Sequence, residues 1–284
     1  EDIAAAGRGH LVTLFEASDR AGGQLHLAAT IPGKEEFRGL IDWFTRQLDH
    51  PKITLRLNTR ATEESLKDFD EVILATGVTP RDPGIPAAPG VQVLSYLDVL
   101  KGATVGRRVA IVGAGGIGFD VAEFLVHHGT SPTLDPALWR REWGVTPAWA
   151  ARGGLTAPQP ERPAREVWLL QRKAEKPGRH LGKTTGWIHR ATLQAKGVKM
   201  IGGVNYERID AAGLHVSHGA NRENPETLAV DAVVLCAGQE PERGLSAQLT
   251  AAGVAHHLIG GADVAAELDA KRAIDQATRL AARL

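Results

Sequence analysis

The sequence feature that most constrains the fold is an apolar run that leads directly into a glycine-rich turn. Residues 109–112 (VAIV) form the run, and residues 113–118 (GAGGIG) follow with the G-x-G-x-x-G spacing. Apolar residues then recur at helical spacing at Val121, Phe124 and Leu125, which predicts a helix. A strand, a glycine turn and a helix in this order are typical of a unit that binds a dinucleotide through its pyrophosphate.

Each glycine of the motif has a separate physical role in such a unit. Gly113 would permit the tight turn, Gly115 would let the backbone approach the phosphates, and Gly118 would let the helix pack closely on the strand. The helix N-terminus then points its free N–H groups at the anion. Glycine makes up 32 of the 284 residues, so the motif alone is a weak signal. A tight strand–helix turn without a ligand is the alternative.

The next predicted strand of this unit ends in two cations. Residues 166–171 (EVWLLQ) predict a strand, and Arg172 and Lys173 follow it. An NAD-specific fold carries Asp or Glu at this point, whereas two cations suit the 2′-phosphate of NADPH. Arginine can bind such a phosphate through two parallel hydrogen bonds. An exposed basic turn without a ligand is the alternative.

Other segments have the pattern of a second dinucleotide-binding unit whose first strand and glycine loop are missing. Residues 11–15 predict a strand that ends at Glu16, where a carboxylate can accept hydrogen bonds from a ribose. A solvated strand end is the alternative for Glu16. The glycine pair at 22–23 follows, and residues 72–77 (VILATG) predict a buried strand with a small-residue turn. Residues 229–238 repeat that last pattern.

The C-terminal stretch predicts a strand, a glycine turn that contains Asp263, and an alanine-rich helix after Asp269. Asp263 could accept hydrogen bonds from a sugar-alcohol chain, and the helix N-terminus could stabilise negative charge on a reduced ring. Otherwise Asp263 is a residue that starts a helix.

The remaining segments predict structure rather than chemistry. Residues 35–50 predict an amphipathic helix, and residues 127–163 an insertion that is largely irregular. His180 and His189 are interpreted as hydrogen-bonded structural residues, and no metal ligand is assigned. Short strands that together predict a small meander lie at residues 198–201, 206–209 and 214–216.

Composition limits the function classes. The 33 basic and 33 acidic residues give zero net charge, so no long-range field would attract nucleic acid or an anionic membrane. No apolar run approaches the roughly 18 residues of a membrane helix, and no signal peptide is recognised. Cys236 is the only cysteine and is expected to be an inert core thiol. A single cysteine excludes an internal disulfide, a redox cysteine pair and an iron–sulfur cluster built from this chain alone. We expect a cytoplasmic location.

Taken together, these residues resemble the C-terminal part of the bacterial NADPH-dependent 2,4-dienoyl-CoA reductase family. Related flavin oxidoreductases, including trimethylamine dehydrogenase, share the outline less closely. The resemblance rests on residues 15–17, 22–24, 31–37, 94–100, 115–120, 170–173, 180–190, 236–241 and 260–275.

The resemblance implies an α/β fold of two Rossmann-like dinucleotide-binding units of the glutathione-reductase-like type, one inserted in the other. A discontinuous FAD-binding domain would comprise residues 1–100 and 240–284, truncated at its N-terminus, and the NADPH-binding domain residues 101–239. By resemblance, the FAD site is lined by Glu16, Gly23, Gln24, Thr76, Gly77, Gly261 and Asp263. The NADPH site is lined by Gly113, Gly115, Gly118, Arg172 and Lys173.

The family implies a larger enzyme, in which an N-terminal barrel holds FMN and the dienoyl-CoA beside a 4Fe-4S cluster. Hydride passes from NADPH to FAD, and electrons then cross the cluster to FMN. None of these 284 residues is a convincing proton donor to a dienoyl substrate, so no catalytic residue is assigned. We expect the chain to carry hydride from NADPH to FAD without reducing dienoyl-CoA by itself. The alternatives are a non-catalytic nucleotide-binding fragment and one subunit of a split complex with a separate barrel polypeptide.

Overall fold

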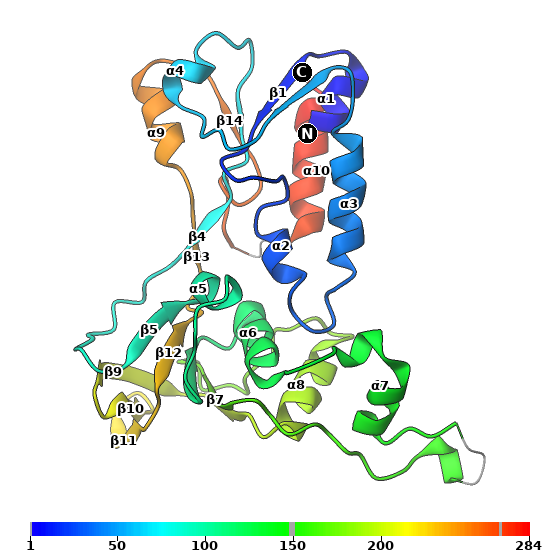
Figure 1. The fold of residues 1–284 in the computed structure, drawn as a ribbon. Coiled ribbons are helices and arrows are strands. Elements are labelled where there is room, and N and C mark those ends of the chain that lie inside the picture. Colours follow the sequence, from blue (N-terminus) through cyan, green and yellow to red (C-terminus); the bar gives the residue numbers. More distant parts are fainter. Residues whose placement is uncertain (1, 148–150, 267–268) are drawn as a thin grey trace. The chain divides into compact units, whose positions relative to one another are not determined.

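The structure is a computed structural model that describes residues 2–147, 151–266 and 269–284. The chain divides into two compact units (Figure 1). The first unit contains Glu1–His26, Glu36–Arg81 and Gln239–Leu284, and the second contains Leu27–Glu35 and Asp82–Gly238.

The first unit has short strands and mostly peripheral helices. Its helices are α1 (Asp2–Arg8), α3 (Phe37–Gln47), α4 (Glu63–Leu66), α9 (Gly244–Ala251) and α10 (Ala270–Ala281), and α2 (Leu25–Ala28) straddles the boundary between the units. Its strands are β1 (Val12–Phe15), β2 (Ile53–Arg56), β3 (Ile73–Leu74), β4 (Val78–Pro80), β13 (Gln239–Pro241) and β14 (His257–Leu258).

The second unit contains longer strands. Its helices are α5 (Tyr96–Leu100), α6 (Gly116–Val126), α7 (Pro136–Trp143) and α8 (Gly186–Ala195), with short 3₁₀ turns η1 (Pro132–Leu134) and η2 (Arg152–Gly154). Its strands are β5 (Gln92–Ser95), β6 (Arg108–Val112), β7 (Glu166–Leu170), β8 (Lys199–Ile201), β9 (Val204–Asp210), β10 (Gly213–His218), β11 (Glu223–Leu228) and β12 (Ala232–Leu235).

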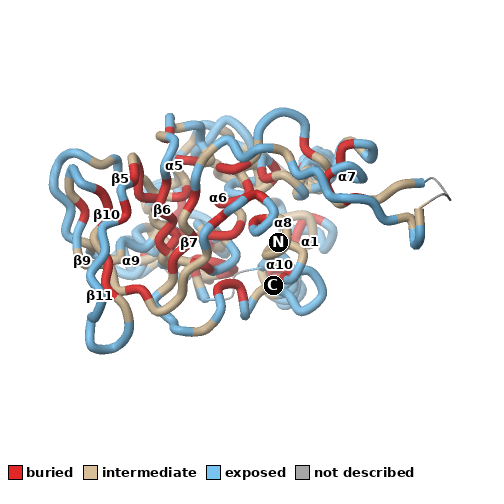
Figure 2. Tube along the Cα trace, turned by 90° about the horizontal axis from the view of Figure 1, so that it is seen from below, coloured by how far each residue is buried: buried red, intermediate tan, exposed pale blue. Residues whose placement is uncertain are grey.

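A five-stranded parallel sheet with the order β5-β12-β6-β7-β8 forms the centre of the second unit. Successive side chains of β6 point to opposite faces of this sheet. Val109 and Ile111 pack with α5, α6 and α8, whereas Ala110 and Val112 pack with the antiparallel meander β11-β10-β9. All four side chains are fully buried, as Figure 2 shows for β6. The predicted α/β fold with a buried strand before the glycine turn is confirmed.

One strand prediction for the second unit was wrong. The strand near residues 198–201 is β8, which pairs in parallel with β7 and does not belong to the meander. The meander instead gains β11, which has no strong apolar pattern. The insertion at residues 127–163 contains α7 and the turns η1 and η2, and its other described residues belong to no named helix or strand. Asp135 caps this helix by accepting hydrogen bonds from the next residues, and Gly144 ends it in the left-handed conformation. Residues 148–150 of the insertion lie outside the described residues.

The first unit has no continuous sheet among its described residues. It has two separate two-stranded parallel sheets, β1-β2 and β3-β14, and an antiparallel pair, β4-β13. Leu66, Val72, Leu74 and Leu249 form its buried cluster. The predicted helix at 35–50 is α3 and the C-terminal helix after Asp269 is α10.

The boundary between the units differs from the predicted domain division. Residues 82–100 cluster with the second unit, because β5 pairs in parallel with β12. Across residues 2–147, 151–266 and 269–284, no helix is both long and apolar enough to cross a membrane.

Candidate nucleotide-binding sites

The turn between β6 and α6 requires glycine at two positions. Gly113 has φ +113°, and a Cβ there would lie 2.2 Å from the Cys236 carbonyl oxygen. A Cβ on Gly118 would lie 1.9 Å from the Gly113 carbonyl oxygen and would also contact Leu169 of β7. The backbone turn and the close helix–strand packing predicted for these glycines are therefore present.

Gly115 differs, because no described residue restricts the position of a Cβ there. It is the N-cap residue of α6, with φ −84°, and a Cβ built on it would meet no atom within 4 Å. Among the described residues no side chain caps the helix, so its first N–H groups have no side-chain partner there. This arrangement fits a pyrophosphate that approaches the backbone closely.

The basic turn lies at the same edge of the sheet as the glycine turn. β6 and β7 are parallel and in register, with Val112 opposite Leu170, so the residues after each strand share one edge. Arg172 is exposed and forms no ion pair with any described residue. The Lys173 side chain is 75% exposed, and its Nζ lies 3.8 Å from Glu175 Oε1. Both cations are therefore accessible to an anionic ligand.

Tyr206 of β9 is a candidate that sequence reasoning missed. Its hydroxyl is buried and has no hydrogen-bond partner in the described part of the chain. Burial raises the pKa of Tyr206, an effect that nearby Arg172 opposes. The Gly113 N–H lies near the Tyr206 hydroxyl. It donates, however, to the Leu170 carbonyl oxygen at 2.8 Å. Tyr206 thus lies next to the glycine turn, with its hydroxyl closed off from solvent. No local pattern around this tyrosine signals that position.

In the first unit, three predicted residues line one cavity. Glu16, Gly23 and Thr76 are among the residues around a cavity of about 820 Å³. Glu16 Oε1 accepts hydrogen bonds from the Ser18 N–H and hydroxyl, both at 2.8 Å. The Thr76 hydroxyl donates to the Glu242 carbonyl oxygen at 2.6 Å. Both side chains are thus held in place by local bonds.

The other predicted residues of the first unit are not among the described residues that line this cavity. Gln24 donates to the Val78 carbonyl oxygen at 3.0 Å, beside Gly77, which has φ +76°. Asp263 Oδ2 accepts from Gln276 Nε2 at 2.7 Å, next to the buried Gly261. Asp263 does not start the following helix, because Asp269 caps α10. The cofactor roles of these residues remain predictions.

The histidines and the cysteine have structural partners. His180 Nε2 lies 2.6 Å from Glu175 Oε1, and His189 Nδ1 lies 2.7 Å from Glu123 Oε1. The hydrogen bond to Glu123 raises the pKa of His189. Cys236 is buried, and burial raises the pKa of its thiol. The hydrogen bonds of both histidines and the burial of Cys236 agree with the predictions.

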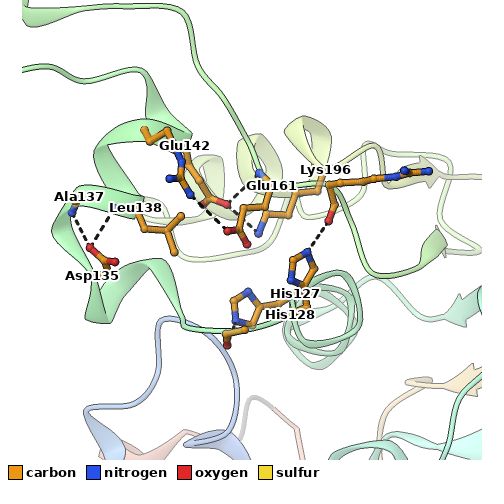
Figure 3. A network of polar contacts seen from close by, with 11 residues as sticks. His127, His128, Asp135, Ala137, Leu138, Glu142, Glu161 and Lys196 are labelled. Carbon is orange, nitrogen blue, oxygen red and sulfur yellow. Dashed lines mark hydrogen bonds and ion pairs between the residues drawn. The ribbon is translucent and has the colours of Figure 1, made fainter.

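A network of ion pairs attaches the insertion to the rest of the second unit (Figure 3). Lys196, at the end of α8, places its Nζ 3.4 Å from Glu142 Oε1 of α7, and both side chains are only 7% exposed. Near the surface, Arg141 lies 3.7 Å from Glu161. This network is far from the glycine turn in sequence and holds α7 against α8.

Comparisons with known proteins show what the chain is similar to. The sequence profile of the family described as pyridine nucleotide-disulphide oxidoreductase matches residues 3–272. A metal reductase from Desulforamulus reducens is 29% identical over 248 residues, which cover 85% of this chain and 36% of that protein. A cinnamate reductase from Clostridium sporogenes is 37% identical over 133 residues, 46% of this chain and 20% of that protein.

Solved structures show the same fold over the whole chain. A 2-naphthoyl-CoA reductase complex superposes with a TM-score of 0.79 at 23% identity and covers 100% of this chain and 37% of the reductase. Histamine dehydrogenase from Rhizobium sp. 4-9 superposes with a TM-score of 0.77 at 20% identity, covering 100% of this chain and 41% of the dehydrogenase. The chain thus spans less than half the length of each of these similar proteins.

Proposed function

Because this chain belongs to the pyridine nucleotide-disulphide oxidoreductase family, we propose that it is the reductase portion of a flavoprotein and carries hydride from NADPH to FAD. The observation that carries the proposal is the open glycine turn and the accessible basic turn at one edge of the second unit's sheet. One feature suits a pyrophosphate and the other a 2′-phosphate.

The second unit supplies the residues for NADPH. The α6 N–H groups and the Gly115 backbone would hold the pyrophosphate, and Arg172 and Lys173 would hold the 2′-phosphate. Tyr206 would pack beside the glycine turn that holds the nucleotide. The positive end of the α6 dipole and the two cations would both attract an anionic ligand.

The first unit supplies the residues for FAD. Glu16 would accept hydrogen bonds from the ribose, and Asp263 from the sugar-alcohol chain. Gly23, Gln24, Thr76, Gly77 and Gly261 would form the neighbouring backbone and side-chain surface. A bound flavin accepts hydride from a reduced nicotinamide, which is the chemistry this proposal requires.

We extend the proposal to a 2,4-dienoyl-CoA reductase-like enzyme of unsaturated fatty acid β-oxidation in the cytoplasm. The support is the motif resemblance. Under this proposal, a barrel that carries FMN and a 4Fe-4S cluster, as a separate polypeptide, would receive the electrons. The similar proteins extend well beyond the matched region, so the residues that act on the final acceptor would lie outside this chain.

One observation favours a second candidate, a nucleotide-binding chain without catalysis. The strands β1 and β3, which flank the proposed FAD ribose site, are not joined into one sheet. A weak FAD site in the first unit would leave the second unit able to bind NADPH without passing its hydride on.

The experiment that separates these candidates is anaerobic. FAD is added to the purified chain, NADPH follows, and bleaching of the flavin absorption band is recorded. Bleaching with NADPH and little with NADH supports hydride transfer, and an Asp263→Ala variant checks the FAD site. A flavin that stays oxidised while NADPH binds would overturn the hydride-transfer proposal and favour the second candidate.

A further inference from the structure

Glu175 is the acidic residue within the basic segment that follows β7. Residues 172–183 contain five lysine and arginine residues and this single carboxylate. The Glu175 side chain is 22% exposed, whereas the Lys173 side chain is 75% exposed. A partly buried negative charge thus lies beside one of the two cations to which we assign the 2′-phosphate of NADPH.

Two basic side chains share one oxygen of this carboxylate. Glu175 Oε1 lies 2.6 Å from His180 Nε2 and 3.8 Å from Lys173 Nζ. Arg179 Nη1 lies 3.8 Å from the other oxygen, Oε2. The short contact with His180 is a hydrogen bond, and the longer contact with Lys173 is an ion pair with a group that is largely in water.

The backbone of this turn is held in place by several neighbours. The Gln171 side-chain amide donates to the carbonyl oxygens of Lys173 and Glu175, at 3.1 and 2.6 Å. The Lys173 carbonyl oxygen also accepts from the Gly203 N–H at 2.9 Å. A Cβ on Gly202 would lie 2.6 Å from the Glu175 carbonyl oxygen, so the turn packs directly on that glycine. Glu175 therefore starts from a fixed backbone position, whereas the long, exposed Lys173 side chain can move.

A fixed carboxylate beside Lys173 opposes the binding of a phosphate in two ways. It gives the lysine an internal anionic partner, which the phosphate must replace. It also carries a charge of the same sign as the phosphate and therefore repels it. A phosphate held by Lys173 would lie within the screening length of about 8 Å at physiological salt, so this repulsion would persist in solution.

We propose that Glu175 sets how strongly the chain prefers NADPH to NADH, by competing with the 2′-phosphate for Lys173. His180 limits this competition, because it occupies the same carboxylate oxygen. Glu175 is thus a positioning residue that acts on the nucleotide through Lys173. This role rests on the proposed function, which places the 2′-phosphate at Arg172 and Lys173.

Equilibrium titration of the full chain with NADPH and with NADH tests the proposal, without FAD so that neither nucleotide is oxidised. Glu175→Gln keeps the size of the side chain and removes its charge. We expect the dissociation constant for NADPH to fall about threefold to fivefold, the size of an exposed ion pair, and that for NADH to stay nearly unchanged. Glu166→Gln is the matched control, because Glu166 is an exposed carboxylate that pairs with Lys199 at 2.8 Å and lies at the opposite end of β7. It should change neither dissociation constant.

His180→Ala should have the opposite effect on NADPH. Removal of the imidazole leaves Glu175 Oε1 to Lys173 alone, so the affinity for NADPH should fall while that for NADH changes little. A merely structural contact between Glu175 and His180 would instead give the same sign in both variants, because each variant breaks the same hydrogen bond. Urea unfolding checks that the variants fold. If Glu175→Gln fails to fold, the fall in NADPH affinity of His180→Ala still decides the question.

A Lys173→Ala background shows whether Glu175 acts through the lysine. In that background, Glu175→Gln should no longer raise the NADPH affinity by much, because the two side chains are coupled. An unchanged or weaker NADPH affinity in Glu175→Gln, the same gain with and without Lys173, an equal shift for NADH, or a higher NADPH affinity in His180→Ala would each overturn the role of Glu175 alone. A wild-type chain that binds neither nucleotide would overturn the proposed function and the role of Glu175 together.

Discussion

At the scale of single residues, the glycines of the β6–α6 turn differ in what an added methyl group would meet. Gly118→Ala would place Cβ against the Gly113 carbonyl oxygen, so we expect it to cost about 1–3 kcal/mol of unfolding free energy. In Gly115→Ala, the added Cβ meets no atom of the described residues within 4 Å, so the variant should fold normally. Its NADPH affinity should nevertheless fall roughly tenfold or more if the phosphates lie there. Urea unfolding and NADPH titration measure the two effects.

The control is Gly39→Ala in α3, where a Cβ also meets nothing within 4 Å. The Gly39→Ala variant should have nearly the same unfolding free energy as the wild type and the same NADPH affinity. Unchanged NADPH binding in the Gly115→Ala variant would contradict the proposed position of the pyrophosphate.

Arg172 is expected to determine the choice between NADPH and NADH. It is exposed and free of ion pairs with the described residues, and each charge-assisted bond to a 2′-phosphate contributes roughly 1.5–3 kcal/mol. Arg172→Glu should therefore reverse or abolish a preference of tens-fold for NADPH, measured as the ratio of the two dissociation constants. Arg179→Glu, a nearby exposed site, is the matched control. The assignment fails if the ratio is the same in the wild type and Arg172→Glu.

The pair of His189 and Glu123 should make stability depend on pH. The hydrogen bond to Glu123 raises the folded-state pKa of His189 above its ordinary value of 6.5, Asp120 adds to this effect, and Lys34 opposes it. The stabilisation is fully present below pH 6.5 and is lost as the pH rises through the higher folded-state pKa. His189→Gln should therefore lower the unfolding free energy more at pH 6 than at pH 9. Equal losses at both pH values would contradict this sign.

At the scale of elements, the contact between α7 and α8 depends on a buried charge pair. Lys196→Met would leave Glu142 buried without its partner, so we expect a loss of about 3–5 kcal/mol in unfolding free energy. Adding Glu142→Leu should recover much of that loss, since no charge then remains buried. Arg141→Met breaks the partly exposed pair with Glu161 and should cost less than about 1 kcal/mol. Similar losses of unfolding free energy in Lys196→Met and Arg141→Met would contradict the expected difference between the buried and the partly exposed pair.

Where a helix begins and ends depends mainly on nearby residues. Which strand pairs with which depends on more distant ones. The α7 helix begins at a capping Asp135 and ends at Gly144, signals that the sequence carries but that the proline-rich surroundings obscured. The partner of β8 was mispredicted because a short apolar strand fits a parallel sheet or a meander equally well.

At the scale of the whole molecule, the two units have separate cores, so ligand stabilisation should be uneven. NADP⁺ at a hundredfold excess over its dissociation constant should stabilise its unit by about 2.7 kcal/mol. Hydrogen exchange should slow in the glycine turn and in β6 and β7, and change little in β1 and β2. Equal protection in both units would show that the nucleotide site is not confined to the second unit.

The sequence by itself determined the order of strand, glycine turn and helix, and the basic turn after β7. These features depend on periodicity, on glycine conformations and on residues a few positions apart, so local physics specifies them. It also predicted the burial of Cys236 and the α/β class of the fold.

Only the tertiary structure decided that Tyr206 lies beside the glycine turn, that Glu142 meets Lys196, and that residues of β1 and β3 line one cavity. Each depends on residues tens of positions apart being brought together. Such contacts form because the buried faces of whole elements must cover one another, and no local pattern encodes which distant partner fulfils that requirement.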